Sequence, residues 1–337
     1  MSFSAVRAAL LAPLAAFLLP LAAGAQATTH VVLALPTTTL TFATDFLASD
    51  AGYFKDEGLD VEMPTLVGVA SINAVINGSA DFTDGTGPVF LRAAAHGQRL
   101  LAIANLIDRP MVELVLRTDV YDALKIAPTM SLAERAKLLK GKTIAIQGVG
   151  SIVHAWERFV AARGGLDPEN DVRIAPMDPP AMLPALLTKA VDGFATSLPY
   201  TTEAVMTGTA KMFASAPQGD APDILPFADG LIMTRQATCD APGDKCRRLL
   251  RALARANALI REHPAEALDM LRPRYKQMKP ELLEAAWRIV APAHTADLRV
   301  TMKSFENSES VNLEAKLLDP KDKLASYDGL ASDAYLP

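Results

Sequence analysis

The stretch ASDAGYFKDEGLDVE, residues 48–62, joins the end of a helix to the start of a strand. Residues 42–52 have the apolar spacing of a helix, which ends at small residues and Gly52. Gly58 then precedes an alternating segment, residues 59–63, which predicts a strand. Because a compact apolar strand at residues 30–35 lies before the helix, the stretch completes a strand–helix–strand unit. Such a unit predicts two parallel strands joined by a crossover helix.

The same alternation of strands and helices continues along the chain and starts afresh near residue 141. There a strand at 141–146 leads through a glycine-containing loop into a helix at 152–163, and beyond residue 245 the pattern is mostly helical. This alternation predicts an α/β fold with mostly parallel sheets, and a length of 337 residues suits two domains. The other predicted strands lie at residues 100–104, 111–117, 172–175, 191–195 and 230–235.

Two short segments echo each other. Residues 77–82 and 188–194 each contain the end of a helix, an Asp and an aromatic-bearing strand. Each segment then leads through a polar loop to a proline, Pro88 in the first and Pro199 in the second. The echo indicates two lobes built on the same plan.

The N-terminus has the features of a secretory signal peptide, which we assign to residues 1–27. Arg7 supplies a positive charge, residues 8–21 are almost wholly apolar, and small residues at Ala25 and Ala27 fit a cleavage site. We predict cleavage after Ala27, with Ala25 as the alternative. A membrane anchor is disfavoured, because the apolar run contains two prolines and is shorter than the ~20 residues of a spanning helix. Export predicts a periplasmic location.

Charge and cysteine content narrow the possible partners. The chain has 33 basic and 38 acidic residues, a net charge of −5, and no basic run interleaved with aromatics, so nucleic acid is not an expected partner. The only two cysteines, Cys239 and Cys246, flank a segment that can turn back on itself, which predicts a disulfide in an oxidising compartment. The five histidines lack the spacing of a zinc site, so we expect no metal and no cofactor.

Residues 48–62 also resemble a signature stretch of one family of periplasmic solute-binding proteins. This family serves ABC importers of the nitrate, sulfonate, taurine and thiamine-precursor type. Further similar segments follow in the family's order, at residues 77–97, 139–146, 150–154 and 190–194.

The resemblance implies a two-lobed periplasmic-binding-protein fold of type II, with a ligand cleft between the lobes. Lobe 1 would contain residues 28–115 and, after the chain returns, residues 229–337; lobe 2 would contain residues 116–228. Strands at 111–117 and 230–235 would be the crossing strands. The resemblance also implies a small-molecule ligand, transient contact with an ABC permease in the inner membrane, and a monomeric receptor.

Four loops that follow predicted strands are the candidate ligand-binding segments. In open α/β sheets, ligands bind outside the carboxyl ends of the strands, where helix N-termini present free N–H groups. The predicted ligand-binding residues are Thr37, Thr38, Thr39, Thr83, Asp84, Gly85, Thr86, Gln147, Gly148, Gly150, Ser151, His154, Thr196, Ser197 and Tyr200.

Residues 147–151, which we name the Gln147 loop, are the most informative of the four. Gly148 and Gly150 permit close approach of the backbone, and Ser151 is a good N-cap for the next helix, with or without a ligand contact. His154 lies in the first helical turn, where it either packs or donates to a bound oxyanion. The loop is no dinucleotide fingerprint, because Val153 stands where the third glycine would be.

Three other residues have two interpretations each. Asp84 is either a counter-charge for an amine on the ligand or a turn-former before Gly85. Asp45 either faces the cleft or lies on a solvated helix face, and we expect the second. Tyr200 either contacts the ligand or packs at the start of a helix.

The ligand class follows from a departure from the family pattern. Family members often carry Trp in the loop before the proline that corresponds to Pro199, whereas this chain has Ser197. Trp156 and Trp287 lie on predicted helices and are expected in the core. We therefore expect a small polar or anionic solute of the sulfonate, taurine or nitrate kind. A thiamine-precursor pyrimidine and a ligand-sensing receptor subunit are the alternatives. An enzyme is not expected, since no general base is placed to activate Ser151.

Overall fold

The computed structural model describes Met1, residues 28–127 and residues 129–337. The predicted signal peptide, apart from Met1, lies outside the described residues, so its cleavage stays a prediction. Among the helices of the described residues, none combines the length and the apolar character needed to cross a bilayer.

Two five-stranded sheets form the framework. The first has the order β2-β1-β3-β10-β4, in which β1 pairs in parallel with β2 and β3, while β10 runs antiparallel between β3 and β4. Its strands are β1 (Thr29–Ala34), β2 (Leu59–Glu62), β3 (Phe82–Gly85), β4 (Leu101–Asn105) and β10 (Leu231–Thr234). The second has the order β7-β6-β8-β5-β9, in which β5 runs antiparallel between β8 and β9. Its strands are β5 (Glu113–Arg117), β6 (Thr143–Ile146), β7 (Arg173–Pro176), β8 (Gly193–Thr196) and β9 (Ala210–Ser215).

The chain crosses between the sheets twice, through residues 106–112 and 216–230. We call the first sheet with its helices lobe 1 and the second sheet with its helices lobe 2. β5 and β10 are the antiparallel strands in their sheets, and each directly follows a crossing, as the prediction of crossing strands requires. The lobe boundaries remain a proposal, and the pairing of β5 in the second sheet favours a boundary before Glu113.

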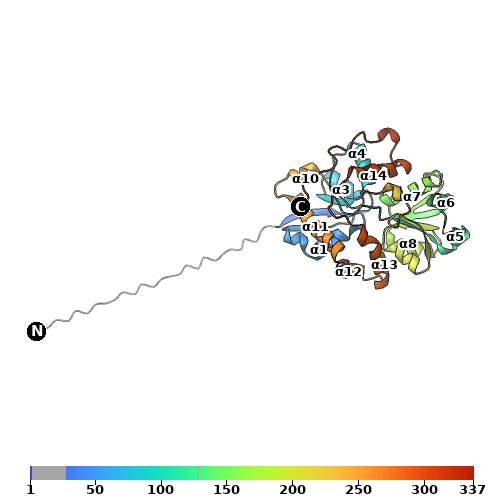
Figure 1. The fold of residues 1–337 in the computed structure, drawn as a ribbon, viewed down its shortest axis with the longest axis horizontal. Coiled ribbons are helices and arrows are strands. Elements are labelled where there is room, and N and C mark those ends of the chain that lie inside the picture. The colour runs from blue at the N-terminus through green and yellow to red at the C-terminus, as the bar shows by residue number, and fades with distance from the viewer. Residues whose placement is uncertain (2–27, 128) are drawn as a thin grey trace.

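Helices cover both sheets (Figure 1). In lobe 2 they are α5 (Thr118–Ala123), α6 (Leu132–Ala136), η2 (Lys137–Leu139), α7 (Ile152–Arg163), α8 (Pro179–Leu187), α9 (Tyr200–Met206) and η3 (Pro222–Ile224). The N-terminal helices of lobe 1 are η1 (Leu40–Phe42), α1 (Ala43–Asp50), α2 (Tyr53–Asp56), α3 (Ala70–Asn77) and α4 (Gly87–Ala95). The C-terminal helices are α10 (Gln236–Asp240), α11 (Lys245–Glu262), α12 (Pro264–Leu271), η4 (Arg272–Tyr275), α13 (Pro280–Val290), η5 (Ala291–Ala293), α14 (Met302–Glu314) and η6 (Pro320–Asp322).

The C-terminal helices connect the two lobes. α11 packs on α1 and α2, whereas α14 contacts both α4 of lobe 1 and α7 of lobe 2. The two tryptophans lie in the cores as predicted: Trp156 is 1% exposed in lobe 2 and Trp287 is 4% exposed among the C-terminal helices. The lobes therefore have separate apolar cores that α14 and the two crossings join.

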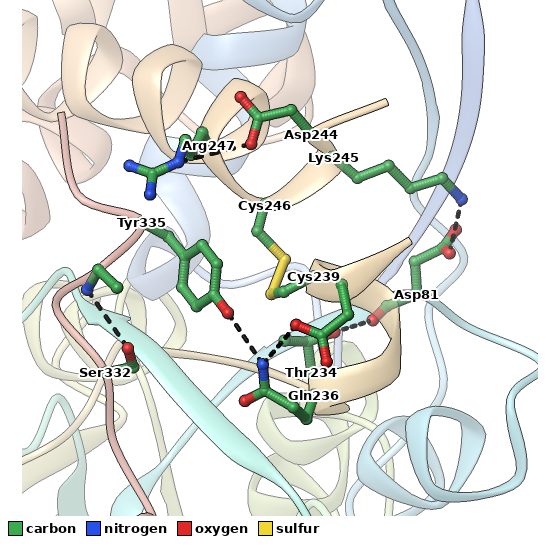
Figure 2. Close-up of a disulfide and its surroundings, with 12 residues drawn as sticks. Asp81, Thr234, Gln236, Cys239, Asp244, Lys245, Cys246, Arg247, Ser332 and Tyr335 are labelled. Atoms are coloured by element: carbon green, nitrogen blue, oxygen red, sulfur yellow. Dashed lines mark hydrogen bonds and ion pairs between the residues drawn. A yellow bond between two sulfur atoms is a disulfide. The ribbon is translucent and has the colours of Figure 1, made fainter. Parts of the chain in front are cut away.

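A disulfide between Cys239 of α10 and Cys246 of α11 confirms the predicted pairing. Figure 2 shows that the bridge closes the turn that leads into α11. Lys245, directly before Cys246, pairs with Asp81 at 2.9 Å. Asp81 also accepts a hydrogen bond from the backbone N–H of Val32 in β1. The bridge and the Lys245–Asp81 ion pair together fix the start of α11 against the first sheet.

Replacing both Cys239 and Cys246 by Ser is expected to lower the free energy of unfolding by about 2 kcal/mol, a value at the low end for disulfides because the closed loop is short. Urea unfolding of the double variant beside the native protein measures this loss. The native protein treated with a reductant should show the same loss. Equal midpoints for all three samples would contradict the prediction.

Candidate ligand-binding cleft

A cavity lies between the lobes at the ends of strands β1, β3, β6 and β8. The interior of the cavity has a volume of about 40 Å³. Residues of both lobes line it: Pro36, Thr37, Thr41, Phe42, Gly68, Ser71, Ile72, Gly85, Thr86, Val89, Asp229 and Met233 from lobe 1 and the crossing, and Gln147, Ser151, Ile152 and Ser197 from lobe 2. Most of the exposed surface of the lining is apolar.

The lobe 1 wall is built where β1 and β3 lead into helices. After β1 the chain passes through Pro36 and Thr37 into η1, which brings Thr41 and Phe42 to the cavity. After β3 it passes Gly85 and Thr86 into α4. A Cβ on Gly85 would lie 2.5 Å from Cε of Met233, so the glycine leaves room for the end of the Met233 side chain.

The lobe 2 wall is the Gln147 loop together with the start of α7. Ser151 caps α7, because its Oγ accepts from the backbone N–H of His154 at 3.3 Å and donates to the carbonyl of Gly148 at 2.7 Å. Oε1 of Gln147 accepts a hydrogen bond from Oγ1 of Thr196 at 2.9 Å, which holds the ends of β6 and β8 together. The N-terminus of α7 therefore points at the cavity with its partial positive charge.

His154 supports this loop and does not line the cavity. Its Nδ1 accepts a hydrogen bond from the backbone N–H of Gly150 at 3.0 Å. Burial, and then the nearby charges of Arg158 and Arg92, lower the pKa of His154 to about 4, so the ring is neutral near pH 7. A neutral ring that accepts through Nδ1 fixes the conformation of the Gln147 loop.

The predicted site residues fall into three groups. Those that line the cavity are Thr37, Gly85, Thr86, Gln147, Ser151 and Ser197. Others lie in the same loops and act on neighbouring backbone or side chains: Thr83, whose Oγ1 donates to the carbonyl of Ala34 at 2.8 Å, together with Gly148, Gly150, His154 and Thr196. Thr38 lines an adjoining groove, half-buried Tyr200 lines another, and Thr39 and Asp84 are buried beside the lining.

The expectation that Asp45 lies on a solvated helix face is wrong. Asp45 is fully buried in the first turn of α1, because α11 and α12 pack on this helix and every residue from Ala43 to Ala48 is buried. Its carboxyl lies close to that of Asp84 at the end of β3, and burial raises the pKa of both groups. The carboxyl of Asp229, in the second crossing, is also buried, and burial raises its pKa to about 7.

Direct contacts join the lobes on either side of the cavity. The backbone N–H of Leu40 in η1 donates to the carbonyl of Leu198 in lobe 2 at 3.0 Å. The Arg92 guanidinium of α4 donates to the carbonyl of Gly150 in the Gln147 loop and to Oδ1 of Asn312 in α14. These contacts place the helix starts of lobe 1 against the loops of lobe 2.

The sequence interpretation missed several residues of the cleft. Asp229 lies two residues before β10, and the rule that loops beside sheet ends hold ligands could have included this second crossing. Ile72, Val89 and Met233 line the cavity through ordinary helix and strand positions. Their apolar side chains carry no signal that separates a ligand wall from a core.

Comparison of folds places this architecture among solved structures of low sequence identity. A protein from Bordetella bronchiseptica RB50 superimposes with a TM-score of 0.76 at 21% identity, covering 91% of this chain and 95% of that one. The alkanesulfonate-binding protein SsuA from Xanthomonas axonopodis pv. citri, bound to MOPS, gives a TM-score of 0.67 at 18% identity, covering 88% and 96%. The periplasmic nitrate-binding protein NrtA from Synechocystis PCC 6803 gives 0.59 at 16% identity, covering 78% and 69%. These structures share the two-lobed periplasmic-binding-protein fold.

Sequence comparison identifies the family. No curated protein matches the chain. The family model described as NMT1/THI5 like, in contrast, matches residues 39–267. This range includes both crossings and every strand except β1. It also includes every loop of the cleft, apart from the first residues of the loop that follows β1. The chain belongs to the NMT1/THI5-like family.

Proposed function

We propose that this protein is the periplasmic solute-binding component of an ABC importer, which captures a small solute between its lobes and delivers it to the permease. The observation that carries the proposal is the cavity at the strand ends, lined by both lobes. The likeness to periplasmic proteins named for sulfonate and nitrate binding supports it. A predicted signal peptide would bring the chain to the compartment where such a protein works.

The crossings provide the hinge that capture requires. The backbone N–H of Leu106 donates to the carbonyl of Gly230 at 2.7 Å, and that of Phe227 donates to the carbonyl of Asp108 at 2.7 Å. The carboxyl of Asp229 accepts from the backbone N–H of Met111 at 2.6 Å. Two segments tied in this way can bend together while each sheet stays intact. A solute that contacts both walls would favour the closed arrangement by its differential affinity for it.

The chemistry of the cleft bears on the expected ligand class. The N-terminus of α7 suits a hydrogen-bond acceptor or an anionic group, as the expected sulfonate, taurine or nitrate would supply. The lining also includes Thr41, Thr86 and Asp229, and most of its exposed surface is apolar. A thiamine-precursor pyrimidine remains the second candidate, since an apolar lining suits a ring. No indole faces the cavity to stack on it.

We propose capture without chemical conversion, and transport in preference to sensing. Ser151 is engaged as a helix cap, and His154 accepts from backbone through Nδ1, so neither is arranged as a nucleophile with its base. A sensor would use the same closure to contact a receptor. Permease and ATPase genes beside this gene would support import, whereas an adjacent receptor kinase gene would support sensing.

The proposal is tested by ligand binding to the mature protein, residues 28–337. A solute present at 100 times its dissociation constant should raise the free energy of unfolding by about 2.7 kcal/mol, which a thermal-shift screen detects. Calorimetry then gives the affinity, and mass spectrometry identifies any solute that is retained during native purification. Failure of sulfonates, nitrate, carboxylates, amines and pyrimidines alike to stabilise the protein would contradict solute capture.

A further inference from the structure

A short loop of lobe 1 stands between the cavity and the space outside it. Residues 65–69, which we name the Val67 loop, lie between β2 and α3. Gly68 lines the cavity, whereas Val67, the residue before it, lines an adjoining outer groove. The cavity and the groove share three lining residues, which are Pro36, Thr37 and Gln147. The Val67 loop is therefore part of the wall that separates the interior of the cleft from the groove.

The Val67 loop meets the Gln147 loop of lobe 2 across the mouth of the cleft. A Cβ on Gly150 would lie 3.3 Å from Cγ1 of Val69. A Cβ on Gly148 would lie 3.7 Å from Cα of Gly68, so at this point the two backbones face each other without side chains between them. Gly68 and Gly150 have φ values of 61° and 78°, which residues with side chains rarely adopt. The close approach thus depends on glycines on both sides of the mouth.

The contact between the two loops is apolar, although each loop is tied to its own lobe. The backbone N–H of Leu66 donates to the carbonyl of Leu35 at 2.8 Å, and Oγ of Ser71 donates to the carbonyl of Gly68 at 3.2 Å. Within the described part of the chain, no hydrogen bond or ion pair joins the Val67 loop to lobe 2. The two loops can therefore part without leaving a polar group unpaired.

The interior of the cavity is too small for a solute to enter without movement of its wall. Its volume of about 40 Å³ is room for about three water molecules, at roughly 10–15 Å³ each. A sulfonate or a pyrimidine is larger than this. Since the Val67 loop has no polar bond to the opposite lobe, it is the part of the wall that moves most readily.

We propose that the Val67 loop is the gate of the cleft, and that solutes enter and leave where it parts from the Gln147 loop. Val69 against Gly150 is the closing contact, and Gly68 opposite Gly148 lets the two backbones meet. The inference rests on the proposed function, since it assigns the entry route of the same cleft. Residues of the gate then set the rate of solute exchange.

A cysteine in the cavity wall reports opening of the gate without any solute. Val89 of α4 lines the cavity and is half-buried, so V89C places a thiol behind the gate. The two native cysteines are bonded to each other and do not compete for the reagent. Adding V69A to V89C should raise the rate of alkylation by iodoacetamide by about threefold, because V69A removes apolar contact that closes the gate. The melting temperature should stay the same, because Val69 is partly exposed and lies in a loop.

V149A in the V89C protein is the matched control. Val149 belongs to the Gln147 loop at the same mouth, but it is 61% exposed and lines neither the cavity nor the groove. V149A should therefore leave the alkylation rate unchanged. A rate that V69A does not raise, or that V69A and V149A raise equally, would overturn the gate. Because no solute is needed, failure of this measurement is distinguishable from failure of solute capture in the thermal-shift screen.

A disulfide across the mouth tests the closing contact directly. The Cβ atoms of a disulfide lie about 3.5–4.5 Å apart, and Cγ1 of Val69 already lies 3.3 Å from a Cβ on Gly150, so V69C/G150C should form a bridge on mild oxidation. V69C/G165C is the matched control, because Gly165 has a similar φ of 73° but follows the far end of α7. The 12 residues of this helix place it about 18 Å from the Gln147 loop. Mass spectrometry of the monomers measures bridging, and equal bridging in the two variants would overturn the inference.

Discussion

Replacing Trp156 by Ala is expected to lower the free energy of unfolding of lobe 2 by about 3–5 kcal/mol, the range for deleting a large buried aromatic side chain. Trp156 is 1% exposed, and its ring stacks on that of Phe159 with centroids 5.5 Å apart. It lies on α7, the helix whose first turn holds the Gln147 loop. The loss should appear in urea unfolding followed by circular dichroism.

Two controls define the cause of that loss. The indole N–H of Trp156 is buried without a partner, so W156F removes an unsatisfied group while keeping most of the contact surface, and it should cost much less than W156A. An equal loss in both variants would show that the N–H has a role that the packing does not explain. Trp287 belongs to another core, so W287F should leave the unfolding of lobe 2 unchanged.

Replacing Arg92 by Met is expected to weaken solute binding by about 30–100-fold, which corresponds to ~2–3 kcal/mol. The substitution leaves the Gly150 carbonyl and Oδ1 of Asn312 without their donor in the buried contact between α4, the Gln147 loop and α14. Burial lowers the pKa of Arg92 to about 10, so the side chain stays charged at neutral pH. Because the contact between Arg92 and Gly150 joins the two lobes, its loss should destabilise the closed arrangement of the lobes.

The Arg92 prediction is checked by calorimetry with the solute that stabilises the native protein. R92K keeps the charge but cannot donate to both acceptors in the same fork geometry, so its affinity should lie between those of the native protein and R92M. Arg99 follows α4 and is exposed, so R99M serves as the matched control. An R92M variant that binds as tightly as the native protein would show that the contact does not contribute to closure.

Regular patterns made most of the fold predictable. The helix predicted at 152–163 coincides with α7, because Ser151 supplies a cap and Gly164 and Gly165 follow its end. β9 was not predicted, since its six residues, Ala210–Ser215, mix small, charged and apolar side chains without clear alternation. α5 was also missed, since it is a short helix, Thr118–Ala123, that packing against β9 and β5 stabilises. α9 begins at Tyr200, where a helix start was one of the two interpretations.

The cleft was predictable to the extent that strand ends mark it. The loops after β1, β3, β6 and β8 all contribute lining residues, as the general rule for α/β sheets requires. The rule does not state which side chain of a loop turns inward, because that depends on the start of the next helix. Asp45 shows a further limit: α11 and α12, distant in sequence, cover α1 and turn an expected surface residue into a buried acid.

The position of β10 imposes an order on assembly. All five strands of the second sheet lie within residues 113–215, so this sheet can form as soon as that part of the chain is free to fold. The first sheet is begun earlier and finished later, because β10, at Leu231–Thr234, fills the place between β3 and β4. Until β10 joins the sheet, β3 and β4 have unpaired backbone N–H and C=O groups along one edge, which can pair with other chains. During folding, lobe 1 is therefore the lobe that stays open to wrong strand pairing for longer.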